Sequence, residues 1–87
     1  MAIDLKIYQP DKVYIETQAD KVVLPVSEGN LTVIHKRAPR IQLLTEGEIS
    51  LLDTQNQTYK KWKIDGGVAE IAEDVCQVAV ENIEEIN

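Results

Sequence analysis

The stretch KVVLPVSEGNLTVIHKRAPRIQLL, residues 21–44, decides the fold. It holds three short apolar runs, at 22–24, 31–34 and 41–44, which are rich in β-branched residues and leucine. Pro, Gly, Ser and Asn occupy the two breaks between these runs, and such residues are typical of turns. Runs of this length with such boundaries indicate strands joined by turns. The first break is acidic and the second is basic, so we expect contacts with two different partners.

The rest of the chain continues the pattern of short strands and turns. Ile3, Leu5 and Ile7 alternate with more polar residues, which is the period of a half-buried strand. Similar patterns predict further strands at 13–16, 48–52, 58–65, 68–71 and 75–80. Residues 17–20 are expected to form a polar break, and residues 81–87 a short polar tail with at most a turn or two of helix.

These patterns define one domain over residues 1–87. Many short strands at close turn spacing indicate an all-β fold. We therefore predict a two-sheet β-sandwich of about ten strands, with a thin aliphatic core between the sheets.

Composition and charge bear on the class of partner. The formal net charge is −6, which disfavours binding to nucleic acid or to anionic lipid, because both need a positive field. The N-terminus has no signal-peptide pattern, and no apolar run is long enough to span a bilayer, so we expect no direct membrane insertion. The single cysteine, Cys76, cannot form an internal disulfide, which fits a reducing compartment.

The residues that could carry chemistry do not form a recognisable site. His35 is the only histidine, and with Cys76 it offers one ligand of each kind, whereas metal sites need more. Ser27 or Ser50 could join His35 in a triad on paper, but no GxSxG elbow is present. Gly66-Gly67 lacks a phosphate-loop pattern and predicts a hairpin turn. We expect no catalytic residue, no metal and no cofactor.

Trp62 lies among three lysines and allows two interpretations. A basic aromatic stripe can bind nucleic acid or an acidic partner. On a strand, however, Lys61 and Lys63 point away from Trp62, which favours an inward indole and a lysine-bearing outer face. Cys76, in the last predicted hairpin, is interpreted as a buried small hydrophobic residue.

Several positions together resemble the epsilon subunit of bacterial F-type ATP synthases. The family pattern is an apolar strand, a small loop with Glu-Gly, a second apolar strand and a turn ending in Ala-Pro. Ser27-Glu28-Gly29, Leu31 and Ala38-Pro39 match it, and glycines before or between later strands match it too, at Gly47 and at Gly66-Gly67. The resemblance covers nearly the whole chain.

The resemblance implies a non-catalytic rotor subunit of the central stalk. Such a subunit clamps the gamma subunit to the membrane ring of c subunits and couples proton- or sodium-driven rotation to ATP synthesis. It would lie peripherally on the cytoplasmic face of the bacterial inner membrane and be monomeric when isolated. Longer members add a C-terminal helical hairpin, which we do not expect in residues 1–87.

The resemblance also assigns two sets of contact residues. A ring-facing loop would consist of Ser27, Glu28, Gly29 and Asn30. A gamma-facing turn and strand would consist of Arg37, Ala38, Pro39, Arg40 and Gln42. The chain departs from many members at residues 35–37, where His-Lys-Arg stands in place of Pro-Gly-His, and at Asn30, where some members carry a carboxylate.

Two alternatives of other classes remain open from sequence. One is a free-standing small β-sandwich enzyme of cupin-like type, against which the lone histidine weighs. The other is a generic adaptor domain with unrelated partners.

Overall fold

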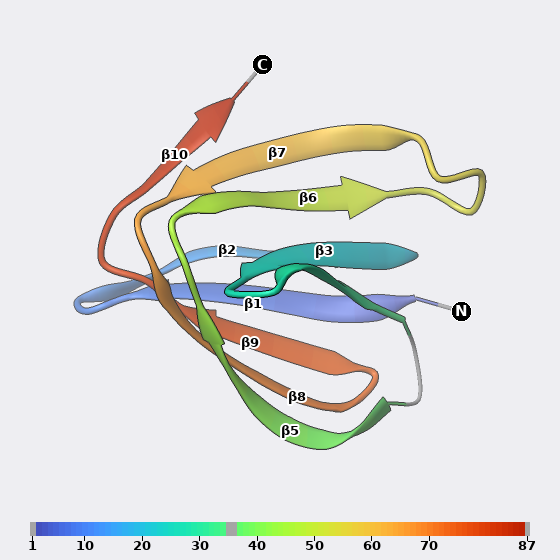
Figure 1. Cartoon of the computed structure of the whole chain (residues 1–87), viewed down its shortest axis with the longest axis horizontal. Coiled ribbons are helices and arrows are strands. Elements are labelled where there is room, and N and C mark those ends of the chain that lie inside the picture. Colours follow the sequence, from blue (N-terminus) through green and yellow to red (C-terminus); the bar gives the residue numbers. More distant parts are fainter. Residues whose placement is uncertain (1, 35–36, 87) are drawn as a thin grey trace.

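The computed structural model describes residues 2–34 and 37–86, and these residues form an all-β structure (Figure 1). The predicted two-sheet β-sandwich is confirmed. The described residues form ten strands: β1 (Ile3–Gln9), β2 (Lys12–Ala19), β3 (Lys21–Val26), β4 (Gly29–Val33), β5 (Arg37–Leu44), β6 (Gly47–Leu52), β7 (Thr58–Ile64), β8 (Gly67–Glu73), β9 (Val75–Ala79) and β10 (Ile83–Ile86).

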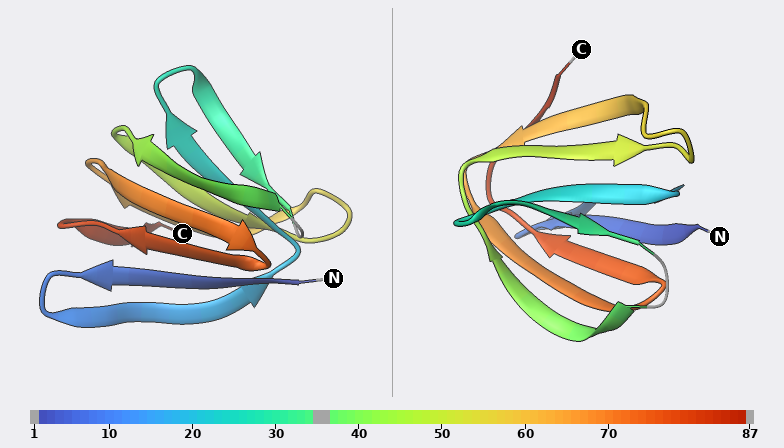
Figure 2. Two further views of the ribbon diagram at one scale, coloured as in Figure 1. Left: turned by 90° about the horizontal axis from the view of Figure 1, so that it is seen from below. Right: turned by 45° about the vertical axis from the view of Figure 1, so that its right-hand side comes forward.

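The strands form two five-stranded sheets that pack face to face (Figure 2). We call the sheet with strand order β2-β1-β9-β8-β5 sheet A, and the sheet with order β10-β7-β6-β3-β4 sheet B. β1 and β9 pair in parallel, and the other strand pairs are antiparallel. Over the described strands the chain changes sheets after β2, β4, β5, β7 and β9, and β5 is the strand with a change of sheet on both sides. β5, inside the deciding stretch, thus ties the two layers together.

The core lies between the sheets and follows from the alternation of each strand. In β1, for example, Ile3, Leu5 and Ile7 face inward, whereas Asp4 is exposed. No polar or charged residue is buried among the described residues. The buried side chains are mainly branched aliphatics around one indole: Ile3, Leu5, Ile7, Ala19, Val22, Leu24, Val26, Val33, Leu44, Ile49, Leu51, Trp62, Ile64, Ala69, Ile71, Cys76, Val78 and Val80.

Two sequence expectations are wrong. Residues 17–19 of the predicted polar break at 17–20 belong to β2, because an edge strand of sheet A can present polar side chains to water on its outer face. The predicted polar tail, with its turn or two of helix, contains β10 over Ile83–Ile86. β10 pairs with β7, and Ile83 packs against the core, so tertiary pairing decides the conformation of a segment whose local pattern is weak.

The turns at one end of the sandwich share a chemical character. They connect β1 to β2, β3 to β4, β5 to β6, β7 to β8 and β9 to β10, and they lie together at the left of Figure 1. A backbone hydrogen bond from Thr45 N to Pro25 O, 3.0 Å long, links the β5–β6 turn to the end of β3. Each carries a carboxylate, so we call this end the acidic end, defined by Asp11, Glu28, Glu46, Asp65 and Glu81. Lys12 and Lys63 are the cations next to these turns.

Candidate functional site

The loop predicted to face the ring is the β3–β4 hairpin at the acidic end. All four of its residues are exposed: Ser27, Glu28, Gly29 and Asn30. Ser27 Oγ lies 2.9 Å from Glu28 Oε2, and its hydroxyl donates to that carboxylate. Gly29 has φ +127°, a backbone conformation that side chains rarely adopt, which explains a glycine at the start of β4. The hairpin therefore presents one carboxylate on a fixed, protruding turn.

The turn predicted to face gamma lies at the opposite end, where β5 begins. Ala38, Pro39 and Arg40 are exposed, and the pairing of β5 with β8 shifts register between Arg37 and Arg40. β5 is an edge strand of sheet A, where a proline costs no ladder hydrogen bond on its free side. The Arg37 backbone pairs with Glu73, and residues 35 and 36 lie outside the described residues. β4 thus separates the two predicted contacts.

Two of the three apolar residues of β5 that the sequence groups together are exposed. Ile41 and Leu43 are 72% and 71% exposed, although the sequence grouped them with Leu44 in one apolar run. Arg40 and Gln42 alternate with them on the side of Leu44, but at the sheet edge Arg40 is exposed and Gln42 is half-buried. Arg40 Nη2 donates to Gln42 Oε1 at 2.8 Å. The alternation of polar residues with Ile41 and Leu43 in the sequence is the pattern that could have predicted which face of β5 these two residues take.

The glycines predicted as structural turns have different roles. Gly66 has φ +137° in the β7–β8 turn. Gly67 is the first residue of β8, and a Cβ there would overlap the carbonyl oxygen of Ala79 and lie 2.9 Å from Val80 Cγ1. Gly47 begins β6, where a Cβ would lie 2.7 Å from Pro25 Cβ. Gly67 and Gly47 therefore permit close approach of neighbouring segments.

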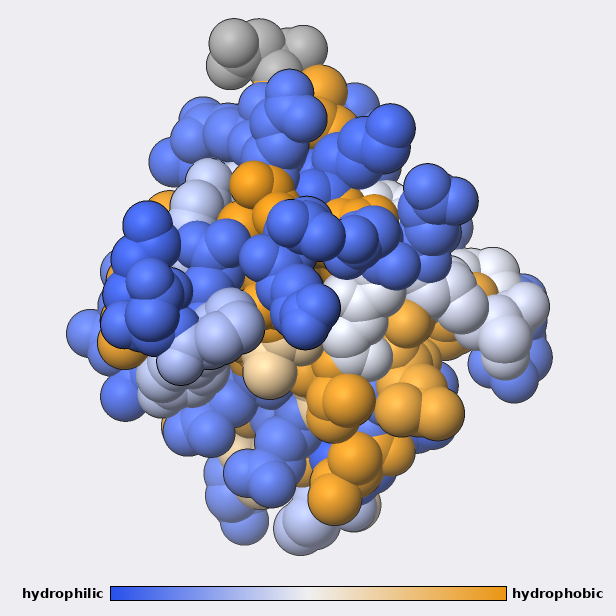
Figure 3. All heavy atoms as spheres, turned by 90° about the vertical axis from the view of Figure 1, so that its left-hand side faces the viewer, coloured by the Kyte–Doolittle hydropathy of each residue, from blue (hydrophilic) through white to orange (hydrophobic). Residues whose placement is uncertain are grey.

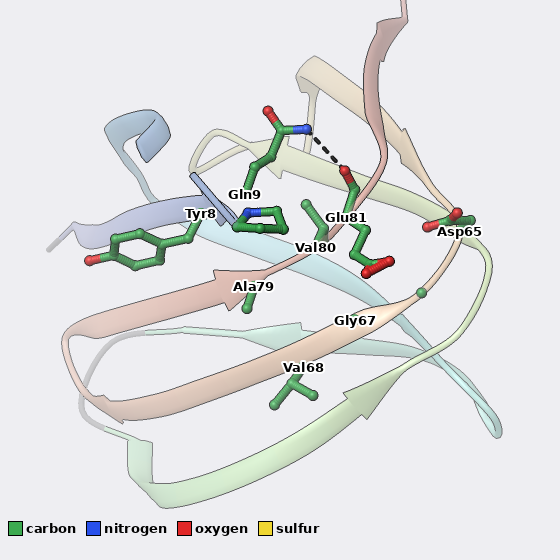
Figure 4. A pocket seen from close by; sticks show the side chains of 10 residues that line it. Tyr8, Gln9, Asp65, Gly67, Val68, Ala79, Val80 and Glu81 are labelled. Carbon is green, nitrogen blue, oxygen red and sulfur yellow. Dashed lines mark hydrogen bonds between the residues drawn. The ribbon is translucent and has the colours of Figure 1, made fainter. Parts of the chain in front are cut away.

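A groove of about 520 Å³ lies on the outer side of sheet A at the acidic end. Figure 4 shows Tyr8, Ala79 and Val68, from β1, β9 and β8, lining it, with Asp65 and Glu81 at its rim. Gln9 Nε2 donates to the Glu81 carbonyl at 3.0 Å, and Asn82 Nδ2 donates to Asp65 Oδ2 at 2.7 Å. The groove therefore has an apolar floor and two exposed carboxylates at its rim. Such a surface is suited to a ligand that carries an apolar group next to a positive charge.

Figure 3 looks onto the acidic end and shows both hydrophilic and hydrophobic side chains on this face. In Figure 3, hydrophilic side chains cover most of this end, and a hydrophobic patch lies low on the right, on the side where Figure 1 places β5 and β8. Sequence reasoning did not find this arrangement, because its residues come from strands far apart in the chain.

Of the residues that could carry chemistry, Ser27 lies in the β3–β4 turn and Ser50 in β6. Among residues 2–34 and 37–86, no group of three or more His, Cys, Asp and Glu side chains could hold a metal ion. His35 lies outside the described residues. In the same described ranges, no helix is long and apolar enough to cross a bilayer. Cys76 is fully buried in β9, and burial raises the pKa of its thiol to about 12.

The Cys76 thiol should therefore be inert in the folded protein. A thiolate is the reactive form, and at mildly alkaline pH burial keeps this group protonated and shielded from reagents. Native protein treated with a chromogenic disulfide reagent should release almost no thiolate dye, and the same protein in concentrated guanidinium chloride should release one equivalent. Rapid reaction of the native protein would show that β9 opens easily.

Comparison with known proteins gives a consistent picture. The family described as ATP synthase, Delta/Epsilon chain, beta-sandwich domain matches residues 2–86. The ATP synthase epsilon chain of Granulibacter bethesdensis is 38% identical over 74 residues, covering 85% of this chain and 54% of that protein. The chain spans 54% to 63% of the length of the curated relatives it matches.

Two solved structures share the fold. A chain of the Euglena gracilis mitochondrial ATP synthase (OSCP/F1/c-ring) has a TM-score of 0.82 at 16% identity, over 95% of this chain and 52% of that one. A chain of the Tetrahymena thermophila mitochondrial ATP synthase (central stalk/c-ring) has a TM-score of 0.72 at 16% identity, over 93% of this chain and 64% of that one.

Proposed function

Since the chain belongs to the ATP synthase delta/epsilon chain beta-sandwich family, as the sequence resemblance predicted, we propose that it is a non-catalytic subunit of the central stalk. In this role it binds the gamma subunit and the polar loops of the c-ring, and passes ion-driven rotation of the ring to the catalytic head. The family match over residues 2–86 is the observation that carries the proposal.

The geometry supports a domain with two separate contacts. The Ser27–Asn30 hairpin and the start of β5 lie at opposite ends of β4, and both are exposed. A subunit that links two partners needs such separation, because each partner must reach its own surface. The domain would sit at the cytoplasmic side of the membrane, held there by the ring and not by insertion of its own chain.

The ring contact is assigned to the β3–β4 hairpin. Its residues Ser27, Glu28, Gly29 and Asn30 protrude, and Glu28 suits a basic side chain on a c-subunit loop. The gamma contact is assigned to β5, through Arg37, Ala38, Pro39, Arg40 and Gln42. Arg40 is exposed beside Pro39, which restricts the backbone, and arginine is suited to bidentate pairing with a carboxylate on gamma.

The direct test is binding to purified gamma subunit. The isolated chain should sediment as a monomer, form a one-to-one complex with gamma at micromolar concentration and co-elute with it in gel filtration. Titration calorimetry would give the dissociation constant. Absence of any complex with gamma from the same enzyme would overturn the proposed function.

The two contacts should respond to different substitutions. Arg40→Ala should weaken gamma binding by roughly 1–3 kcal/mol if the guanidinium is buried in the complex. Glu28→Lys should leave gamma binding intact and loosen attachment to the ring by about 0–1 kcal/mol, most visibly at low salt. The measurements are calorimetry with gamma and rebinding to membranes that contain the ring. The opposite pattern would show that the two faces are reversed.

A further inference from the structure

The hairpin assigned to the ring protrudes on a short tip. β3 enters the hairpin through Pro25 and Val26, and β4 leaves it from Gly29. The ladder between β3 and β4 continues to the pair of Val26 and Gly29, so Ser27 and Glu28 form the tip, and both are exposed. The stiffness of such a hairpin depends on what lies against its base.

The base of the hairpin is buried where strand alternation would expose it. Leu24, Pro25 and Val26 are all buried, whereas Lys21 and Val23, earlier in β3, are only half-buried. Alternate residues of a strand face opposite ways, so three consecutive buried residues mean that β3 is covered on both faces at this point. Leu24 and Val26 belong to the core, and a second element therefore covers Pro25.

The β5–β6 turn is the element that covers Pro25. Gly47 begins β6, and a Cβ built there would lie 2.7 Å from Pro25 Cβ and 3.3 Å from Pro25 Cγ. A side chain does not fit in so short a gap, so glycine is what lets the backbone at 47 reach the proline ring. Next to this contact, Thr45 N donates to Pro25 O at 3.0 Å. We call these residues the hairpin clamp, defined by Pro25, Thr45 and Gly47.

The strand ladder of sheet B does not supply this link. β3 pairs with β6 at Lys21, Val22 and Val23, and the pairing ends before Pro25. A proline has no backbone N–H to donate to a neighbouring strand, and its ring fixes the φ angle, which limits bending of β3 at the entrance to the hairpin. The Pro25 carbonyl accepts from Thr45 instead. The clamp thus takes the place of the ladder with one hydrogen bond and one close packing contact.

The clamp joins the hairpin to the strand that carries the other assigned contact. β5 ends at Leu44, directly before Thr45, and Leu44 is buried in the core. β5 lies in sheet A and β3 in sheet B, so the clamp connects the two sheets at the acidic end. From the clamp, β5 leads back to Arg40 and Pro39 near its start. The hairpin, the clamp and β5 therefore form a continuous packed route between the two assigned contacts.

We propose that the hairpin clamp is a mechanical link, which holds the ring-contacting hairpin rigid against the end of β5. A sideways load on Glu28 then reaches β5 without bending the hairpin at its base, because closely packed groups have low compressibility and transmit displacement. This inference rests on the proposed function. The clamp residues are positioning residues, since none of them belongs to either assigned contact.

Two substitutions at Thr45 separate the backbone link from the side chain. Thr45→Pro removes the N–H that donates to Pro25, and the preceding Leu44 already lies in a strand, the conformation that a following proline favours. Thr45→Ala keeps the N–H and is the matched control. In the isolated chain, Thr45→Pro should speed amide hydrogen exchange in the ladder of the hairpin base about tenfold or more, whereas Thr45→Ala should change it less than about threefold.

The load is tested in the complete enzyme. Each variant is added to membranes whose enzyme lacks this subunit, and ion pumping and ATP hydrolysis are measured together. Thr45→Pro should bind purified gamma with a dissociation constant within about twofold of wild type, because Thr45 lies outside the assigned contacts. It should nevertheless lower the number of ions pumped per ATP about twofold or more, since a loose hairpin gives way under load. Thr45→Ala should pump like the wild type.

A second variant and a stability control complete the test. Gly47→Ala should lower pumping per ATP in the same way, because its Cβ would push against the Pro25 ring. Val22→Ala is the control, since Val22 is buried in β3 away from the clamp and its truncation lowers stability by leaving a cavity. Thermal melts by circular dichroism show which variants are folded and allow comparison at matched melting temperature.

The outcomes separate the clamp from the function on which it rests. Folded Thr45→Pro or Gly47→Ala variants that pump like the wild type would overturn the clamp and leave the proposed function standing. An equal loss of pumping in Val22→Ala at matched stability would also overturn it, because the loss would then follow from stability alone. Failure of the wild type to bind gamma and to restore pumping would remove both the clamp and the proposed function.

Discussion

Replacing Trp62 with alanine should lower the free energy of unfolding by about 3–5 kcal/mol, the usual cost of removing a buried large aromatic side chain. The indole is fully buried at the centre of the core, between the two sheets. A small domain has only about 5–15 kcal/mol of stability, so this one change should remove a large part of it. Urea unfolding followed by far-ultraviolet circular dichroism gives the value without relying on the lost indole fluorescence.

Two further variants show what the indole contributes. Trp62 Nε1 is buried without a hydrogen-bond partner among the described residues, so Trp62→Phe loses no hydrogen bond and should cost clearly less than Trp62→Ala. Tyr59→Ala, on the same strand and 55% exposed, should stay within about 0.5–1 kcal/mol of wild type. A cost below about 1 kcal/mol for Trp62→Ala would contradict the packing of the core around this residue.

The sequence predicts the sandwich well where local pattern and tertiary environment agree. Ile3, Leu5 and Ile7 alternate in sequence and are buried in β1. Trp62 was expected inward from alternation with Lys61 and Lys63, and it is inward. In both places one face of a strand meets the core and the other meets water, so the period of two carries the information.

The sequence does not tell which apolar residues of β5 face the core. Ile41 and Leu43 belong to the same apolar run as Leu44 in the sequence, yet they are exposed whereas Leu44 is buried. Hydrophobicity alone does not distinguish a residue that packs in its own core from one that packs against a partner. The same limit applies to Val13, which the sequence placed in a strand and which is 52% exposed on β2.

Long-range pairing explains the other failures. β10 forms because β7 offers it an edge, and nothing within residues 81–87 specifies that edge. The acidic end needs five turns to meet, and they meet only when both sheets are formed. Glu28 could be singled out from sequence because it lies in one conspicuous turn, whereas Asp65 and Glu81 gain their significance only from the groove that they share with Tyr8.

The two adjacent leucines of β5 should differ strongly in how much their replacement by alanine lowers the free energy of unfolding. Leu44→Ala should lower the free energy of unfolding by about 2–5 kcal/mol, because Leu44 is 6% exposed and its removal leaves a cavity in the core. Leu43→Ala removes the same atoms one residue earlier, but at 71% exposure it should change stability by no more than about 0.5 kcal/mol. Equilibrium urea unfolding of both variants measures the difference directly.

The pair should separate again when gamma binding is measured on folded protein. Leu43→Ala should weaken the complex, because Leu43 is exposed on β5, the strand proposed to contact gamma, while Leu44→Ala should leave affinity nearly unchanged once the folded fraction is taken into account. A larger loss of stability for Leu43→Ala than for Leu44→Ala would show that β5 is turned with Leu43 inward.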